Sequence, residues 1–314
     1  MGKKQIKSGF IPLEVKNLSQ RHREASRKLL TGFTLIELLT AVAIISILIA
    51  VLIPSLSMVR DMARQTKQNA QFSAIDLALL SFKADYGDYP PSLWHPALSP
   101  KYCGAQKLAE ALLGLDLLGF NPNTVWDPTQ PVREQYYPAN LDPTDPCDRA
   151  NLDARKGPYL EPSRANAFRL GISAAGASDG LFANTMELEK DTYVICDIYG
   201  TKTIVYSNGR TVKAGTPILY YKADPSKKTI STGLPQDRIY NCLDNYPLID
   251  LRKMPDGKPQ PLGDNSGMFQ FFYQQYIKDP RITNTAWPYR PDSYVLISAG
   301  ADGFYGTSDD VTNF

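Results

Sequence analysis

The sequence has little of what enzymes use for proton transfer and nucleophilic attack. Only 2 of its 314 residues are histidines. His22 lies in a basic N-terminal segment, and His95 lies in a proline-flanked loop, where a structural histidine is the ordinary case. The sequence has no H-E-x-x-H motif and no phosphate-binding glycine loop, and GISAAG at residues 171–176 does not match the G-x-S-x-G elbow of hydrolases. These absences disfavour an enzyme.

Cysteine is also scarce. The four cysteines are widely spaced and form no C-x-x-C pair, so neither zinc binding nor thioredoxin chemistry is indicated. Disulfides are one interpretation if the domain lies outside the cytoplasm, and buried free thiols are the other. Four cysteines allow three pairings, and spacing does not choose among them. The residues concerned are Cys103, Cys147, Cys196 and Cys242.

The net charge of +2 is small, but it is unevenly spread. Residues 1–32 carry eight Lys or Arg against Glu14 and Glu24, so the rest of the chain is mildly acidic. An acidic balance disfavours nucleic acid as the main partner, because phosphate backbones attract basic surfaces. The basic segment precedes an apolar run, which is the pattern of a cytoplasmic, positive-inside flank.

Residues 33–53 form an apolar run that contains a single carboxylate, Glu37. As a helix this run would be about 31 Å long, close to the thickness of a bilayer core. A cleaved secretory signal would have a small-residue site after the run, whereas Gly32 lies before it. An ionised glutamate at membrane depth is expensive unless a positive partner is present. The sequence therefore predicts a single membrane-spanning helix whose carboxylate needs a partner.

The stretch G-F-T-L-I-E at residues 32–37 resembles the processing site of type IV prepilins, and a plain signal anchor is the alternative interpretation. The resemblance implies that a prepilin peptidase removes the leader, residues 1–32, by cutting between Gly32 and Phe33. It also implies N-methylation of Phe33 and pairing of Glu37 with the α-amine of Phe33 on a neighbouring subunit. The leader is longer than in many members of that family.

The helix is expected to continue beyond the membrane. Pro54 lies at the exit and should kink or loosen the helix there, because proline lacks a backbone donor. From residue 55 the pattern is amphipathic, and an apolar stripe at spacings of 3, 4 and 3 predicts one buried helical face. DYGDYPPS at residues 85–92 then ends the helix, because glycine and proline interrupt helices. This ending is similar to the end of the first helix in G-type pseudopilins. The stripe consists of Phe72, Ile75, Leu79 and Phe82.

Beyond the helix we expect an α+β domain with an antiparallel sheet and loop-rich insertions. Residues 104–119 read as a short helix ended by Gly119, and the aromatic run at 267–277 reads as a core or interface helix. Asn208-Gly209 predicts a type I′ hairpin turn, and residues 120–190 read as loops. Strands are predicted at residues 192–200, 202–207, 216–224 and 293–298.

The C-terminal stretch is rich in glycine and carboxylates. Its oxygen ligands suit calcium, although the spacing is not that of an EF-hand. The ending resembles that of G-type pseudopilins, whose loop binds calcium. The resemblance therefore implies that loop 298–311 binds calcium as a cofactor. An acidic turn without metal is the alternative. The implied ligands are Asp302, Asp309 and Asp310, assisted by Ser298.

The absences described above disfavour an enzyme, and the resemblance implies a filament subunit with the pilin fold, an α+β fold. The expected divisions are the leader at 1–32, a transmembrane or filament-core helix at 33–54, an amphipathic helix at 55–88 and an extracytoplasmic domain at 89–314. The resemblance implies a subunit of a type II secretion pseudopilus. A type IV pilus pilin serving adhesion, motility or DNA uptake is one alternative. A membrane-anchored module that binds polysaccharide is another.

The resemblance also implies partners and a location. The partners are prepilin peptidase, other copies of the chain, other pseudopilins or pilins, the inner-membrane assembly platform and the membrane itself. The expected location is the inner membrane, with a single pass and the C-terminal domain in the periplasm. The assembled filament would lie in the cell envelope.

Overall fold

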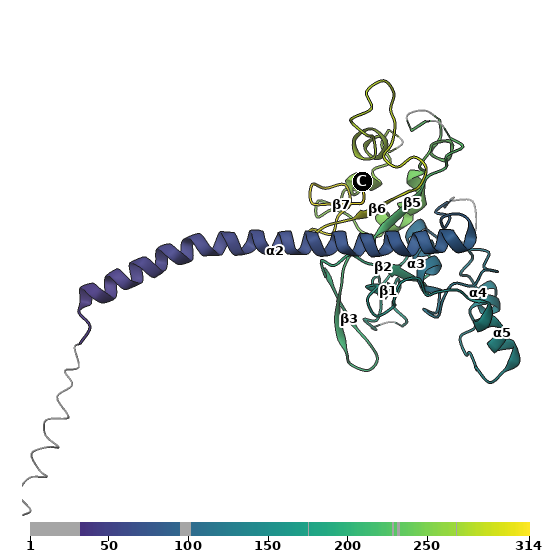
Figure 1. Cartoon of the computed structure of the whole chain (residues 1–314), viewed down its shortest axis with the longest axis horizontal. Helices are drawn as coiled ribbons and strands as arrows, with labels where there is room; N and C mark the ends of the chain where they lie inside the picture. Colours follow the sequence, from purple (N-terminus) through teal and green to yellow (C-terminus); the bar gives the residue numbers. More distant parts are fainter. Residues whose placement is uncertain (1–31, 95–101, 175, 228, 231–232, 268) are drawn as a thin grey trace, which may run out of the picture. The chain divides into compact units, whose positions relative to one another are not determined.

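The computed structural model describes residues 32–94, 102–174, 176–227, 229–230, 233–267 and 269–314. The chain divides into two compact units, Met1–Val59 and Arg60–Phe314. Helix α2, Leu35–Tyr86, contributes to both units (Figure 1). The predicted leader up to residue 31, together with His22 and His95, lies outside the described residues.

In the first unit, α2 is one continuous helix. It runs through Pro54 without a break, so the expected loosening does not end the helix. Its apolar side chains at residues 35–53 are largely exposed. The helix is long and apolar enough to cross a membrane by length and composition. Exposure of this much apolar surface to water is unfavourable.

The second unit is an α+β assembly of short elements. Its described residues form three antiparallel sheets, β1-β2, β3-β4 and β5-β6-β7, where a single sheet was expected. The helical elements are α3 Gly104–Leu113, α4 Val132–Tyr136, α5 Pro146–Ala154, η1 Pro235–Asp237, η2 Cys242–Asn245, α6 Tyr246–Asp250, η3 Pro261–Gly263 and the π-helix η4 Phe271–Tyr276. The strands are β1 Ala167–Arg169, β2 Tyr193–Ile195, β3 Lys202–Val205, β4 Thr211–Ala214, β5 Leu219–Lys222, β6 Tyr294–Ser298 and β7 Val311–Thr312.

The division of the sheet has a local cause next to β5. The backbone N–H of Ile218 donates to the carbonyl of Ile195 at 2.8 Å, and Cys196 faces Pro217 in an isolated antiparallel bridge. Proline has no N–H to donate, so it interrupts a strand ladder. β2 and β5 therefore lie side by side without becoming one sheet.

The sheet β5-β6 is buried on both faces. One face carries Tyr220 and Leu296 and packs on α3 and on the apolar stripe of α2. The other face carries Tyr221 and Val295 and packs on side chains such as Leu248 and Phe272 from residues 233–277, here called the C-terminal insertion. The predicted stripe is confirmed, because all four of its members are at most 3% exposed: Phe72, Ile75, Leu79 and Phe82.

Three local predictions need correction. The helix predicted at 104–119 ends at Leu113, because Gly114 takes a positive φ of 85° that closes the helix. The aromatic run folds as a π-helix of six residues, shorter than the predicted 267–277. The segment 120–190, expected to be loops, contains α4, α5 and β1.

The β3-β4 hairpin is present, but its turn is not type I′. The carbonyl of Tyr206 accepts a hydrogen bond from the N–H of Gly209 at 2.9 Å, and its own N–H donates to Arg210 at 3.0 Å. Tyr206 and Arg210 are therefore the last bonded pair, and residues 207–209 form a three-residue loop between them. Within this loop only Gly209 has a positive φ, 78°. A three-residue loop needs one left-handed position rather than two. The Asn-Gly pair identified the hairpin correctly but gave the wrong turn.

A buried carboxyl group makes the second unit sensitive to pH. Asp244 is 2% exposed, accepts the N–H of Trp94 at 3.2 Å and accepts the hydroxyl of Ser92. Burial raises its pKa to about 7, against the opposing effect of these hydrogen bonds and of the Lys107 ammonium. The folded state therefore holds a proton that the unfolded state releases from about pH 4 upward.

We predict that the second unit loses stability as the pH rises from 3.8, the ordinary value for this carboxyl, to about 7. The slope from Asp244 alone is about 1.4 kcal/mol per pH unit, and Asp244→Asn should remove it. Urea unfolding followed by tryptophan fluorescence measures this, because all three tryptophans lie in the second unit. Asp256→Asn, at an exposed ion pair, is the control. An unchanged slope in Asp244→Asn would contradict the assignment.

Candidate functional site

The predicted processing segment lies immediately before α2. Gly32 has open space around its Cα, because no atom lies within 4 Å of the point where a Cβ atom would be. Phe33 is 79% exposed, and Thr34 is the last residue before the helix. The segment is therefore an exposed, non-helical stretch, which is the form in which a peptidase can reach a backbone carbonyl.

Glu37 has a local partner that sequence reasoning missed. Its Oε2 atom accepts the backbone N–H of Thr34 at 2.9 Å and the Thr34 hydroxyl at 2.7 Å. In return, the N–H of Glu37 donates to the Thr34 hydroxyl at 3.3 Å. This reciprocal arrangement is a capping box, in which a first-turn carboxylate and a threonine satisfy free backbone donors. The signal was present in the sequence as T-x-x-E at 34–37.

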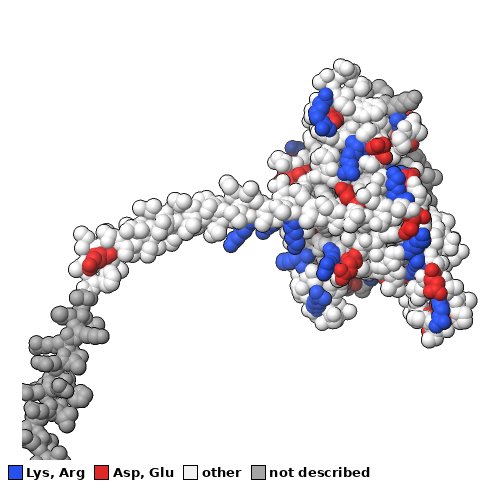
Figure 2. All heavy atoms as spheres, in the orientation of Figure 1, with Lys and Arg blue, Asp and Glu red and all other residues white. Residues whose placement is uncertain are grey.

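The surface after Glu37 is apolar over a long stretch. Between Glu37 and Arg60 the sequence contains no charged residue. Figure 2 shows this part of the helix as almost uniformly uncharged on the visible face. Exposed fractions of 48% at Ile49 and 68% at Val51 mean that little in this unit covers the large apolar side chains. The first unit therefore offers an apolar cylinder with one carboxylate near its beginning.

The C-terminal loop begins where β6 ends and holds the predicted calcium ligands. Ser298 is fully buried, Asp302 is exposed, and Asp309 and Asp310 are half-buried. The N–H of Asp302 donates to Asp309 Oδ2 at 3.0 Å. The hydroxyl of Thr307 donates to Asp309 Oδ1 at 2.6 Å. The structure thus joins Asp302 and Asp309 through the backbone N–H of one and a carboxylate oxygen of the other.

The carboxylate oxygens of the loop are already used by protein donors. Asp302 Oδ1 accepts the N–H of Phe304 at 2.7 Å. Asp310 Oδ2 accepts the Tyr276 hydroxyl at 2.6 Å and the N–H of Gly306 at 2.7 Å. Burial raises the pKa of Asp310 to about 6. Within the described residues, no group of three or more His, Cys, Asp or Glu side chains is placed to hold a metal.

These oxygens have the right chemistry for calcium but not the arrangement. A calcium ion needs six to eight oxygens directed at one point. Here the oxygens of Asp302, Asp309 and Asp310 are directed at backbone N–H groups and hydroxyls. The residues present do not form a coordination shell, so calcium binding stays a prediction from the resemblance.

Asp197 is a buried carboxyl that sequence reasoning did not single out. Its Oδ1 atom accepts the N–H of Thr216 at 3.1 Å, and its Oδ2 atom accepts the hydroxyl of Ser298 at 3.1 Å. Burial raises its pKa to about 7, and Asp309 adds to the effect. Ser298 therefore faces Asp197 in the core. The D-I-Y-G turn at 197–200 was visible in the sequence, but its contact with β6 was not.

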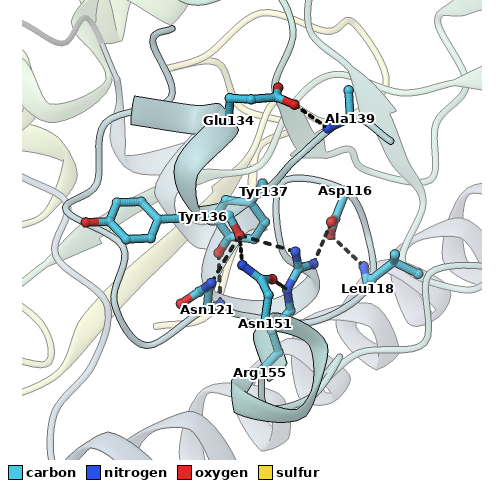
Figure 3. Close-up of polar contacts among 9 residues, drawn as sticks. All are labelled: Asp116, Leu118, Asn121, Glu134, Tyr136, Tyr137, Ala139, Asn151 and Arg155. Atoms are coloured by element: carbon cyan, nitrogen blue, oxygen red, sulfur yellow. Dashed lines mark hydrogen bonds and ion pairs between the residues drawn. The ribbon is translucent and has the colours of Figure 1, made fainter. Parts of the chain in front are cut away.

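A second polar cluster holds the insertion around α4 and α5 together (Figure 3). The carbonyl of Tyr136 accepts hydrogen bonds from Asn121 at 3.0 Å, Asn151 at 3.4 Å and Arg155 at 3.2 Å. The Arg155 guanidinium also forms an ion pair with Asp116. The charged and polar groups of this cluster are paired with one another, so we interpret the cluster as structural.

The structure contains the cysteines as free thiols rather than as disulfides. All four are unpaired, Cys103, Cys196 and Cys242 are buried, and Cys147 is exposed. Burial raises the pKa of Cys103 to about 12 and that of Cys242 to about 12. These buried residues are inert thiols, because the thiolate is the reactive form.

Comparison with protein-family models, curated proteins and solved structures found no match to this chain. What the structure establishes is the class of protein. It is an α+β protein whose N-terminal helix is long and apolar enough to cross a membrane.

From the resemblance we predict that millimolar calcium raises the melting temperature of the protein. At a calcium concentration 100 times the Kd the gain would be about 2.7 kcal/mol. Asp309→Asn should abolish the calcium-dependent shift, whereas Asp224→Asn, in a separate turn, should keep it. Thermal unfolding in calcium, in magnesium and in EDTA measures the effect. If calcium gives no shift in the natural chain, the loop is an internally bonded acidic turn.

Proposed function

We propose that this chain is a structural subunit of a type II secretion pseudopilus, a filament that helps export folded proteins. The main support for this proposal is the exposed apolar half of α2, which has a single carboxylate near its start. The G-F-T-L-I-E stretch at 32–37 and the glycine-rich, acidic C-terminal ending support the same proposal. In this view prepilin peptidase cuts after Gly32, Phe33 is methylated, and the chain is held in the inner membrane before assembly.

The physical basis of assembly is the need to cover the apolar helix. Burying apolar area is favourable by about 25 cal/mol per Å². Helices from several subunits, packed side by side, would cover each other once they leave the bilayer. An unpaired Glu37 would resist this burial, and the α-amine of Phe33 on a neighbouring subunit would relieve it. The charge would then select the register of assembly rather than add stability.

A type IV pilus subunit is the second candidate. It shares the processing motif and the helix, and the large domain at residues 89–314, with its inserted α4, α5 and η elements, favours a larger or minor subunit. A membrane-anchored binding module is the third. In each case the domain would lie outside the cytoplasm. The partners of a pseudopilin or pilin would be copies of the chain, other pilins or pseudopilins and the assembly platform, whereas the binding module would hold polysaccharide.

The test of function is a strain that lacks the gene. We expect secreted proteins to accumulate in the periplasm while sheared surface filaments persist. Quantifying both from the same culture, with the gene restored on a plasmid as control, measures this. Loss of filaments with normal secretion would replace the pseudopilus by a pilus. Normal filaments and normal secretion would leave the anchored binding module.

The capping box allows the charge of Glu37 to be separated from its cap. Glutamine at this position keeps the capping hydrogen bonds but removes the charge. We predict that Glu37→Gln blocks assembly while membrane insertion is unchanged. Thr34→Ala removes the cap, which is worth about 1 kcal/mol, but keeps the charge, and should assemble.

Crosslinking of membrane fractions, with immunoblotting for the inserted monomer, measures both variants. Assembly by Glu37→Gln together with failure by Thr34→Ala would show that Glu37 acts as a cap. The charge-pairing role would then be wrong.

A further inference from the structure

The second unit contains a cavity that the filament proposal does not use. It has a volume of about 300 Å³, at the small end of the range for ligand pockets. Its walls come from parts of the chain that are distant in sequence. Leu181 and Phe182 precede β2, Pro217 precedes β5, Leu248 belongs to α6, and Tyr305 belongs to the C-terminal loop.

The charged groups of the cavity have one sign. Lys202 and Arg252 line it, and none of its described lining residues is acidic. The Arg252 guanidinium donates through Nη1 to the carbonyl of Gly303 at 3.0 Å and lies 4.0 Å from the Phe304 ring centre. The ion pairs found among the described residues include neither Lys202 nor Arg252. Two cations beside apolar walls create a positive potential.

An unsatisfied hydroxyl also lines the cavity. Thr216 is 7% exposed, and its Oγ1 atom has no hydrogen-bond partner among the described residues. The backbone of Thr216 is fixed, because its N–H donates to Asp197 at 3.1 Å and its carbonyl accepts from Asp197 at 2.8 Å. A Cβ atom added at Gly303 would lie 3.0 Å from Thr216 Oγ1 and 2.5 Å from Arg252 Nη1. Gly303 thus keeps open the space between these two polar groups.

We propose that this cavity binds a small organic anion, a carboxylate on an apolar body. The body would lie against Leu181, Phe182 and Leu248, where apolar contact is favourable. The carboxylate would take the unused donors of Arg252, the ammonium of Lys202 and the hydroxyl of Thr216. Buried polar groups normally have partners, so an orphaned hydroxyl beside cations marks the anionic end. A free hydrocarbon acid and the carboxyl terminus of a peptide share this chemistry.

The test uses the full chain in lipid nanodiscs and isothermal titration, with empty nanodiscs as the blank. The probes are hexanoate, its neutral analogue hexanamide, and acetyl-alanyl-leucine with a free carboxylate. We expect hexanoate to bind about tenfold more tightly than hexanamide, because hydrogen bonds to charged groups are the stronger ones. Tighter binding of the dipeptide than of hexanoate identifies a peptide terminus as the natural source, and the reverse order identifies a small acid.

Two variants locate the site. Lys202→Gln changes an exposed side chain and should weaken hexanoate about tenfold but leave hexanamide unchanged. Thr216→Val keeps the shape and removes an unpartnered hydroxyl, so it should fold and bind about fivefold more weakly. Lys258→Gln, at a surface ion pair outside the cavity, is the matched control and should bind normally.

Three results would overturn the proposal. The first is the absence of hexanoate binding at millimolar concentration, which would mean that water alone fills the cavity and pairs Thr216. The second is equal affinity for hexanoate and hexanamide, which would remove the role of charge. The third is normal binding by both Lys202→Gln and Thr216→Val, which would place the ligand elsewhere. None of these results depends on whether the chain forms a filament.

Discussion

The structure of the second unit depends on one constraint, the burial of β5 and β6 on both faces. All five residues of β6, Tyr294–Ser298, are buried. Side chains alternate across a strand, so one face serves α2 and α3 and the other serves the C-terminal insertion. A sheet in this position needs covering elements on both sides.

Helix α2 meets two environments along its length. At residues 60–86 it presents a buried stripe to α3 and to β5-β6, and this packing stabilises the domain. At residues 35–59 its apolar side chains are exposed within their own unit, and their burial requires lipid or other helices. The same helix is therefore a domain element at one end and, at the other, a segment long and apolar enough to cross a membrane. Glu37 lies at the exposed end, where one charge has the largest effect.

The C-terminal loop links the core to the polar features of the domain. Ser298 ends β6 and binds Asp197, Asp310 binds Tyr276 of η4, and Tyr305 lines the cavity. Changes in this loop would therefore reach both the core and the cavity. An ion bound to the loop would have to compete with these internal hydrogen bonds.

The sequence by itself determined the features that depend on local spacing. The long apolar run, the stripe from Phe72 to Phe82 and the strand ending at Ser298 follow from periods of 3.6 and 2, which any short segment displays. The capping box at 34–37 was equally local and could have been found. Tertiary structure alone decided the split of the sheet at Pro217, the contact of Asp197 with Ser298 and the cavity around Thr216. Asp197 and Ser298 are 101 residues apart, and the cavity joins still more distant segments. No local period records which distant segments pack together.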